Sequence, residues 1–277
     1  MSALRASKAH AYGNDFLLVP QTEVRLTPDA PYGDGAALAR ALCARHEGIG
    51  ADGLILYTLR DRGATMTLFN ADGSRAELSG NGLRCLGALI VRAQNLAGGA
   101  TITIETAAGD KRLDLLARDG ERYTFRAAMG PAENIQQTAI PVGTEEVTAT
   151  VLRVGNPQCV VLGPLPAPDR FAWLGPALST HPRFPEGTNV EFAEVETPTR
   201  VRILIWERGV GPTTSSGTGA CAAAVAAAAH GGAARELDVV APGGIQTVEW
   251  HDDGVYLTGW AEIILEGEWV GGRQAES

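Results

Sequence analysis

A short motif that occurs twice is the feature that most constrains the fold of this sequence. Ser79-Gly-Asn-Gly82 follows a strand-like run and leads into an apolar, helix-like stretch, and Ser216-Gly-Thr-Gly219 does the same 137 residues later. Two Gly-Asn pairs, Gly13-Asn14 and Gly155-Asn156, also precede apolar runs and lie 142 residues apart. Two landmarks in the same order at nearly the same offset predict an internal duplication. We therefore expect two halves built alike, with one active site between them.

The segments between these landmarks predict many strands and few helices. Helical patterns occur at Gly35 to Arg45, Leu83 to Ala97 and Thr218 to His230. The last is mostly alanine with few polar positions, so we expect it to run through the middle of a domain. Many strands with one long helix in each half indicate an α+β fold. Short runs rich in β-branched or aromatic residues predict strands at Leu54–Leu59, Ala64–Phe69, Thr101–Glu105, Arg122–Ala127, Val147–Val154, Val201–Trp206, Leu237–Ala241 and Gly254–Thr258.

A Gly-Pro-containing stretch near Met129 to Glu133 is the expected boundary between the halves. It divides the chain into an N-terminal domain of residues 1–128 and a C-terminal domain of residues 129–264. We expect the tail, residues 265–277, to pack back on the first domain. The full length of 277 residues is sufficient for two domains with separate cores.

Composition narrows the classes of function. A formal net charge of -9 argues against a general binder of nucleic acid or of anionic membranes. No apolar run approaches the roughly 18 residues of a membrane-spanning helix, and the start has no secretory signal. The four cysteines are scattered without a CxxC pair, and the histidines show no metal-binding spacing. We expect a soluble cytoplasmic protein with reduced thiols and no metal.

Both glycine-rich motifs are candidate anion-binding sites. A turn that enters a helix leaves backbone N–H groups unsatisfied where the helix dipole is positive, and this arrangement binds carboxylates or phosphates. Glycine at positions 80, 82, 217 and 219 allows close approach of a ligand to the backbone. Neither motif fits a P-loop or GxGxxG. The alternative is that both are only tight strand-to-helix turns.

Further polar residues lie where a ligand could be bound. Trp206-Glu207-Arg208-Gly209 ends a predicted strand nine residues before Ser216. Glu207 and Arg208 form either a solvated ion pair or an acid/base group beside a bidentate carboxylate clamp. Asparagine side chains supply paired donors and acceptors, although Asn70 and Asn81 also suit turns. The asparagines near apolar strands are Asn14, Asn70, Asn81, Asn156 and Asn189.

Together these motifs resemble the diaminopimelate epimerase family nearly from end to end. That family comprises cofactor-independent enzymes that invert one stereocentre of diaminopimelate for lysine and peptidoglycan synthesis. The matching segments occur in the family's order. They are Lys8–Phe16, His46–Gly53, Phe69–Ser74, Gly80–Gly82 with Arg84-Cys85, Gly155–Pro157, Arg183–Asn189, Glu207–Gly211 and Gly217–Ala222.

The resemblance implies a fold, a site and partners. It implies two pseudo-symmetric domains, each a β-barrel-like sheet around a central helix, that bind a small amino dicarboxylate such as diaminopimelate between them. It also implies a homodimer without a cofactor. In the family, a thiolate in one domain removes the α-proton and a thiol in the other returns it on the opposite face. By position, the expected substrate contacts are Asn14, Asn70, Gly80, Asn81, Asn156, Asn189, Arg208, Gly217 and Thr218, with Glu207 in a catalytic role.

Three positions depart from the family pattern. Ser79 and Ser216 stand where the family has its two catalytic cysteines, and Gln158 stands where it usually has a histidine. A free thiol has a pKa near 8.5, which a helix N-terminus lowers, whereas an alkanol hydroxyl is far less acidic. Serine is a poor base unless another group takes its proton, and glutamine cannot. Cys85 and Cys221 lie within the helices that follow, so we expect them to be core residues.

Four interpretations stay open at this point. The first is an epimerase in which both cysteines were deliberately replaced, although Gln158 argues against this. The second is a natural isomerase or dehydratase that uses Glu207 or another carboxylate as base. The third is a protein that binds an amino acid without turnover. The fourth is a protein that retains only the fold. Because nearly all expected ligand contacts persist, ligand binding is a better supported prediction than catalysis.

Overall fold

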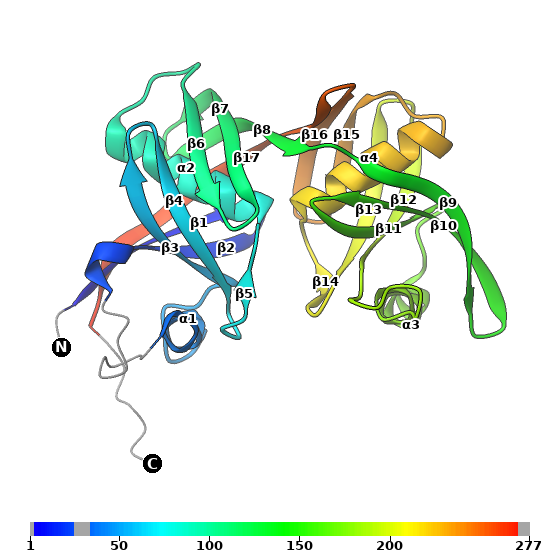
Figure 1. Cartoon of the computed structure of the whole chain (residues 1–277), viewed down its shortest axis with the longest axis horizontal. Helices are drawn as coiled ribbons and strands as arrows, with labels where there is room; N and C mark the ends of the chain where they lie inside the picture. Colours follow the sequence, from blue (N-terminus) through cyan, green and yellow to red (C-terminus); the bar gives the residue numbers. More distant parts are fainter. Residues whose placement is uncertain (1–2, 25–33, 271–277) are drawn as a thin grey trace, which may run out of the picture. The chain divides into compact units, whose positions relative to one another are not determined.

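The computed structural model describes residues 3–24 and 34–270, and these form two compact units (Figure 1). Unit 1 contains the described residues up to Phe125 together with those from Trp260 onward, and unit 2 runs from Arg126 to Gly259. The helices have the bounds α1 Gly35–Cys43, α2 Gly80–Gln94, α3 Pro168–Ser179 and α4 Gly217–His230, with a short 3-10 helix at Gln21–Glu23.

The strands alternate with these helices in the same order in both units. The strands before the boundary are β1 Leu4–Ala11, β2 Asn14–Pro20, β3 Gly53–Arg60, β4 Gly63–Asn70, β5 Arg75–Ala76, β6 Thr101–Thr106, β7 Gly109–Asp119 and β8 Arg122–Gly130. Those that follow are β9 Glu133–Val142, β10 Glu145–Val154, β11 Asn156–Leu162, β12 Asn189–Thr197, β13 Arg200–Glu207, β14 Gly211–Thr213, β15 Glu236–Ala241, β16 Gly244–His251 and β17 Gly254–Trp269.

The pairing of the strands repeats between the units. In unit 1, β1 and β2 are antiparallel, β2 and β3 parallel, β3 and β4 antiparallel, β4 and β6 parallel, and β6 and β7 antiparallel. In unit 2, β10, β11, β12, β13, β15 and β16 pair in the same sequence of directions. The structure thus has the α+β fold with two pseudo-symmetric halves that the repeated motif predicted.

One helix in each unit is enclosed by its sheet. Helix α2 contacts β1, β2, β3, β4 and β6, and all its residues from Gly80 to Val91 are buried. Helix α4 contacts β10, β11, β12, β13, β15 and β16. The eight residues from Ala220 to Ala227 are almost completely buried, because alanine side chains let the surrounding strands approach closely. The prediction that the alanine-rich helix runs through the middle of a domain is confirmed.

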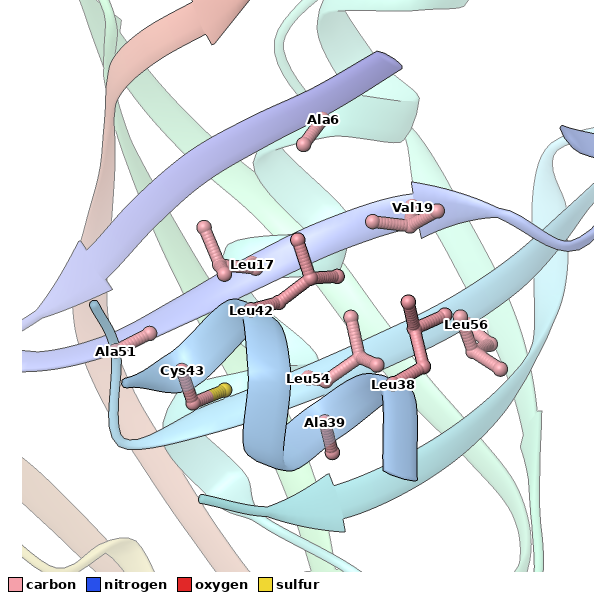
Figure 2. Packing of buried hydrophobic residues seen from close by; sticks show 10 residues of the cluster. All are labelled: Ala6, Leu17, Val19, Leu38, Ala39, Leu42, Cys43, Ala51, Leu54 and Leu56. Atoms are coloured by element: carbon pink, nitrogen blue, oxygen red, sulfur yellow. The ribbon is translucent and has the colours of Figure 1, made fainter. Parts of the chain in front are cut away.

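A second helix covers the opposite face of the sheet in each unit. Figure 2 shows Leu38 and Leu42 of α1 packed on Leu17, Leu54 and other apolar side chains. Successive residues of a strand point to opposite faces of the sheet. The strand residues next to Leu17 and Leu54 therefore point away from α1, toward the enclosed helix α2. In unit 2, α3 covers β12 in the same way, and no sequence pattern predicted it. Pro176 lies inside its last turn and argues against a helix, but Pro168 suits the first turn.

The boundary between the units falls within two continuous strands, β8 and β17. The structure divides after Phe125 and again after Gly259, whereas the sequence placed these limits at 128 and 264. The expected strand from Gly254 extends to Trp269, and its last part pairs with β1. In the tail, residues 265–269 pair with β1 of unit 1. Residues 271–277 lie outside the described residues. No helix in the described part of the chain has the length and apolar character needed to cross a membrane.

Both enclosed helices begin at a serine that caps them. The Ser79 and Ser216 backbones have the same extended conformation, with φ of -136° in each. The Ser79 hydroxyl accepts a hydrogen bond from the Gly82 amide at 3.1 Å, and the Ser216 hydroxyl accepts one from the Gly219 amide at 3.2 Å. This is the geometry of an N-cap, which satisfies one of the free amides of the first turn. The glycines therefore lie inside the helix rather than in a preceding turn, and α2 begins three residues earlier than predicted.

We expect Ser79→Ala and Ser216→Ala each to lower the free energy of unfolding by about 1 kcal/mol, since alanine leaves the third amide of the helix unsatisfied. Ser79→Gly and Ser216→Gly should cost only a few tenths of that amount, because glycine is a tolerated cap residue. Urea unfolding measures both effects. Alanine variants as stable as the glycine variants would show that the hydroxyls contribute nothing as caps.

A paired arginine and glutamate link β8 to β16 within unit 2. Arg126 donates through Nε and Nη2 to the two carboxylate oxygens of Glu249, each at 2.8 Å. Mainly through this hydrogen bonding, Arg126 lowers the pKa of Glu249 to about 2. A carboxyl whose pKa is lower in the folded than in the unfolded chain stabilises the fold above its unfolded pKa, and this stabilisation is lost as pH falls through the folded value.

Wild-type protein should therefore lose more stability between pH 6 and pH 2.5 than Arg126→Met does. After a discount for the partial exposure of both side chains, we expect a difference of roughly 1–2 kcal/mol in unit 2. Urea unfolding midpoints at the two pH values provide the measurement. Arg122→Met, which removes a more exposed pair with Glu262, is the control and should show a smaller difference. Equal acid sensitivity of Arg126→Met and wild type would contradict this assignment.

Candidate functional site

In unit 1, the polar residues predicted from the motifs gather at the N-terminus of α2. Asn81 donates from Nδ2 to Asn14 Oδ1 at 3.1 Å, and Asn14 donates from Nδ2 to Asp52 Oδ2 at 2.8 Å. Asn81 is buried in the first turn of the helix, and Asn14 begins β2. The two asparagines that were expected to contact a ligand thus lie beside the Ser79 cap and orient each other.

Charged groups that the sequence did not single out support this arrangement. Arg45 Nη2 lies 2.6 Å from Asp52 Oδ1 and 3.1 Å from Asp15 Oδ1. Lys8 Nζ also lies 2.9 Å from Asp15 Oδ2. Burial opposes ionisation of Asp15, but hydrogen bonds from Lys8 and Arg45 outweigh it and lower the pKa of this carboxyl. Asp52 is therefore held by a charged network while its second oxygen orients Asn14.

A fully buried arginine lies on the same helix. Arg84 donates from Nη2 to Asn81 Oδ1, and its guanidinium lies 5.8 Å from the centre of the Tyr12 ring. Burial raises the pKa of Tyr12, an effect that the positive charge of Arg84 partly offsets. Arg84 therefore adds positive charge to the end of the helix where the dipole is already positive.

Asn70, another predicted ligand residue of unit 1, makes its hydrogen bonds to Ser74 rather than to this group. Its Nδ2 donates to Ser74 Oγ at 2.9 Å, and its backbone amide donates to the Ser74 carbonyl at 2.8 Å. The side chain is exposed at the end of β4, where Asn70 pairs with Gly53. These hydrogen bonds to Ser74 give Asn70 the turn role that the sequence allowed.

In unit 2, the corresponding residues gather at the N-terminus of α4. One end of the Gln158 side-chain amide meets Asn156 Oδ1 and lies 3.2 Å from the Thr218 hydroxyl, and the other end lies 3.0 and 3.1 Å from the two Glu191 carboxyl oxygens. Gln158 and Glu191 are both fully buried. Four side chains from three elements therefore form one hydrogen-bonding group next to the Ser216 cap.

Glu191 was missed by sequence reasoning and has an unusual environment. A Cβ atom on Gly219 would lie 2.6 Å from Glu191 Oε1 and 3.1 Å from Ser216 Oγ, so the carboxyl reaches the first turn of α4 beside the serine. Burial raises the pKa of Glu191 well above its usual value, and the negative charge of Glu207 raises it further. No sequence motif singled it out, and it is the strand pairing that matches Glu191 with Ile55 of unit 1, since Glu191 pairs with Val160 of β11 as Ile55 pairs with Leu18 of β2.

Asn189 and Arg208 also meet in unit 2. The Arg208 backbone amide donates to Asn189 Oδ1 at 2.9 Å, and Asn189 Nδ2 donates to the Pro157 carbonyl at 3.4 Å. The Arg208 guanidinium donates to the Glu186 carbonyl at 3.0 Å from Nη1, and its side chain is exposed. This leaves a positively charged group at the end of β13, next to Glu207, as the sequence predicted.

The cysteines of the two enclosed helices lie in the cores of the units. Cys85 and Cys221 are completely buried within α2 and α4, as predicted. Burial strongly raises the pKa of Cys85, so its thiol stays protonated. Cys159 on β11 is also buried, and its pKa is raised to about 12 by burial and by the charge of Glu191. A thiolate at neutral pH is therefore disfavoured at Cys85 and Cys159.

Comparison with known proteins gives the same family over nearly the whole chain. The family profile described as "Diaminopimelate epimerase" matches residues 6–135 and 150–264. A diaminopimelate epimerase of Desulforudis audaxviator is 42% identical, over 95% of this chain and 98% of that protein. One from Pelotomaculum thermopropionicum is 36% identical over the same shares of both chains.

Solved structures share the fold at much lower sequence identity. A predicted epimerase from Pseudomonas aeruginosa is similar with a TM-score of 0.72 at 15% identity, over 97% of this chain and 100% of that one. A hydroxyproline epimerase from Agrobacterium vitis gives a TM-score of 0.66 at 18% identity, over 97% and 91%. The profile match and the sequence identity, rather than these structures, decide the assignment: this chain belongs to the diaminopimelate epimerase family and is an epimerase-like isomerase by descent.

Proposed function

We propose that this protein binds an amino dicarboxylate such as diaminopimelate at the N-termini of α2 and α4, and acts on its α-carbon with impaired or altered proton transfer. The observation that carries the proposal is the paired cap geometry. Each enclosed helix presents first-turn amides beside a serine and a hydrogen-bonded asparagine. Such helix ends bind carboxylates.

The altered chemistry follows from what each serine hydroxyl does. Both hydroxyl oxygens already accept a hydrogen bond from an amide of the helix, so a lone pair of each oxygen is engaged and is not free to accept the α-proton. Serine stays protonated at neutral pH, whereas a thiol at a helix N-terminus ionises readily. The family position of a histidine is occupied by Gln158, which cannot carry a proton. Ser79, Ser216 and Glu207 remain the candidate catalytic residues, but without a thiol pair.

A non-catalytic amino-acid binder is the second candidate function. Its support is the retention of the asparagines, Arg208 and both helix ends, together with the complete burial of Cys85 and Cys221. A divergent isomerase or dehydratase with a carboxylate base is the third, and Glu191 and Glu207 supply carboxyl groups in unit 2. A homodimer and a cytoplasmic location are proposals that rest on the family resemblance alone.

Exchange of the α-proton of diaminopimelate with deuterated solvent tests the catalytic part. We expect exchange by the wild-type protein to be slow, since a missing general base costs roughly 10²–10⁴ in rate per group. Ser79→Cys with Ser216→Cys should increase the rate, and addition of Gln158→His should increase it further. Proton NMR follows the loss of the α-signal. Rapid exchange by the wild-type protein at neutral pH contradicts impaired proton transfer.

Calorimetric titration with diaminopimelate tests the binding part. Saturable binding is expected, and Arg208→Ala should weaken it about 10- to 100-fold through loss of a charge-assisted hydrogen bond. Arg202→Ala is the matched control, because Arg202 is an exposed arginine on β13, the strand that Arg208 directly follows, and it pairs with Glu196. If wild-type protein shows no binding at millimolar concentration, the proposed site is wrong. Binding without exchange would favour the non-catalytic candidate.

A further inference from the structure

The two units differ behind their cap serines. A Cβ atom on Gly82 in unit 1 would lie 3.1 Å from Ile55 Cδ1, whereas one on Gly219 in unit 2 would lie 2.6 Å from Glu191 Oε1. The strands beside Ile55 and Glu191 differ in the same way. Phe16 of β2 in unit 1 corresponds to Gln158 of β11 in unit 2. One half-site therefore rests on apolar side chains, and the other rests on a carboxyl and an amide.

The Gln158 amide connects Glu191 to the ligand-facing residues. One end of the amide lies 3.0 and 3.1 Å from the two Glu191 oxygens, and the other end meets Asn156 Oδ1 and the Thr218 hydroxyl. An amide has a donor end and an acceptor end, so the group that Glu191 presents decides which end of Gln158 turns toward it.

Two hydrogen-bonding states follow. When Glu191 is protonated, its hydroxyl donates to Gln158 Oε1, Gln158 Nε2 donates to Asn156 Oδ1, and Asn156 Nδ2 is left to donate to a ligand. When Glu191 is ionised, Gln158 Nε2 must donate to the carboxylate, so Gln158 Oε1 turns toward Asn156. Asn156 then has to donate to Gln158 and presents Oδ1 outward.

We infer that the Glu191–Gln158 pair is a proton-controlled switch that sets whether Asn156 offers a donor or an acceptor to a ligand. The protonated state suits a ligand carboxylate, and the ionised state suits an ammonium group. Glu191 is a positioning residue in this scheme, since it acts through Gln158. The inference rests on the proposed function only in taking Asn156 as a ligand contact.

The surroundings of Glu191 favour the protonated state at neutral pH. Glu191 is fully buried on β12, and Glu207 on the neighbouring β13 adds a negative charge that further disfavours ionisation. Cys159 on β11 also interacts with Glu191, and its raised pKa keeps the thiol neutral although the positive charge of Arg183 acts on it in the opposite direction. Helix α3 packs on the opposite face of β12 through Val190 and Phe192, and α4 contributes the hydroxyls of Ser216 and Thr218.

Binding of pimelate tests the switch, because this dicarboxylate has no amine that titrates in the same range. Above the range in which the pimelate carboxyls themselves titrate, its affinity for the wild-type protein should be constant below the Glu191 pKa and fall by up to about tenfold per pH unit above it. Glu191→Gln should flatten this profile, since its side chain cannot ionise. Gln158→Met should also flatten it, because the link to Asn156 is lost. Glu236→Gln, an exposed change in unit 2, is the control and should keep the wild-type profile.

A second measurement needs no ligand. The side-chain amide NMR signals of Gln158 and Asn156 should shift together as the pH rises in the wild-type protein, and neither shift should occur in Glu191→Gln. Amide signals that do not titrate, or pimelate profiles identical in wild type and Glu191→Gln, overturn the switch. Titrating amides in a protein that binds no pimelate would support the switch and count against the proposed function.

Discussion

The hydrogen bond from a first-turn amide to a serine hydroxyl is the interaction on which both half-sites depend. It fixes where α2 and α4 begin, and so it fixes where their remaining amides point. Because each helix is enclosed by strands, its N-terminus has a set position relative to the ends of those strands. The asparagines at the starts of β2 and β11 are brought beside the caps for this reason.

The same interaction shows what a serine contributes at these two positions. Serine is among the preferred N-cap residues, so a cysteine-to-serine change at these positions keeps the start of the helix while it removes an acidic group. Under the proposed function, ligand binding and proton transfer are therefore separate properties of these helix ends. The two halves also differ in chemistry, since Ile55 lies behind Ser79 and Glu191 lies behind Ser216.

Much of the fold could be predicted from the sequence because its signals are local. The repeated motif predicted the duplication, and the alanine-rich run predicted the enclosed helix. Helix α3 was missed because Pro176 argues against a helix, and packing on β9, β12 and β13 compensates for it. The start of α2 was placed three residues late, since glycine and asparagine have low helix propensity and the cap overrides it.

The candidate site was predicted less completely, for a physical reason. Asn14, Asn81 and Asn156 were identified from motifs, and the structure brings each to a helix end. Glu191 was not identified, because a glutamate between Val190 and Phe192 has the pattern of a solvent-facing strand residue. Its burial depends on α4 covering that face of β12, which no local pattern shows. Asp52 and Arg84 were missed for the same reason, as their roles depend on long-range partners.

A crystal structure of the protein with diaminopimelate bound is the most direct test of the central claim. That claim is that both helix ends still hold the ligand although the thiol chemistry is absent. The predicted result is an α-carboxylate on the first-turn amides of α2 and α4, with Ser79 and Ser216 adjacent to the α-carbon and both serines still capping their helices. A ligand bound away from these helix ends, or caps broken by a bound ligand, would contradict it.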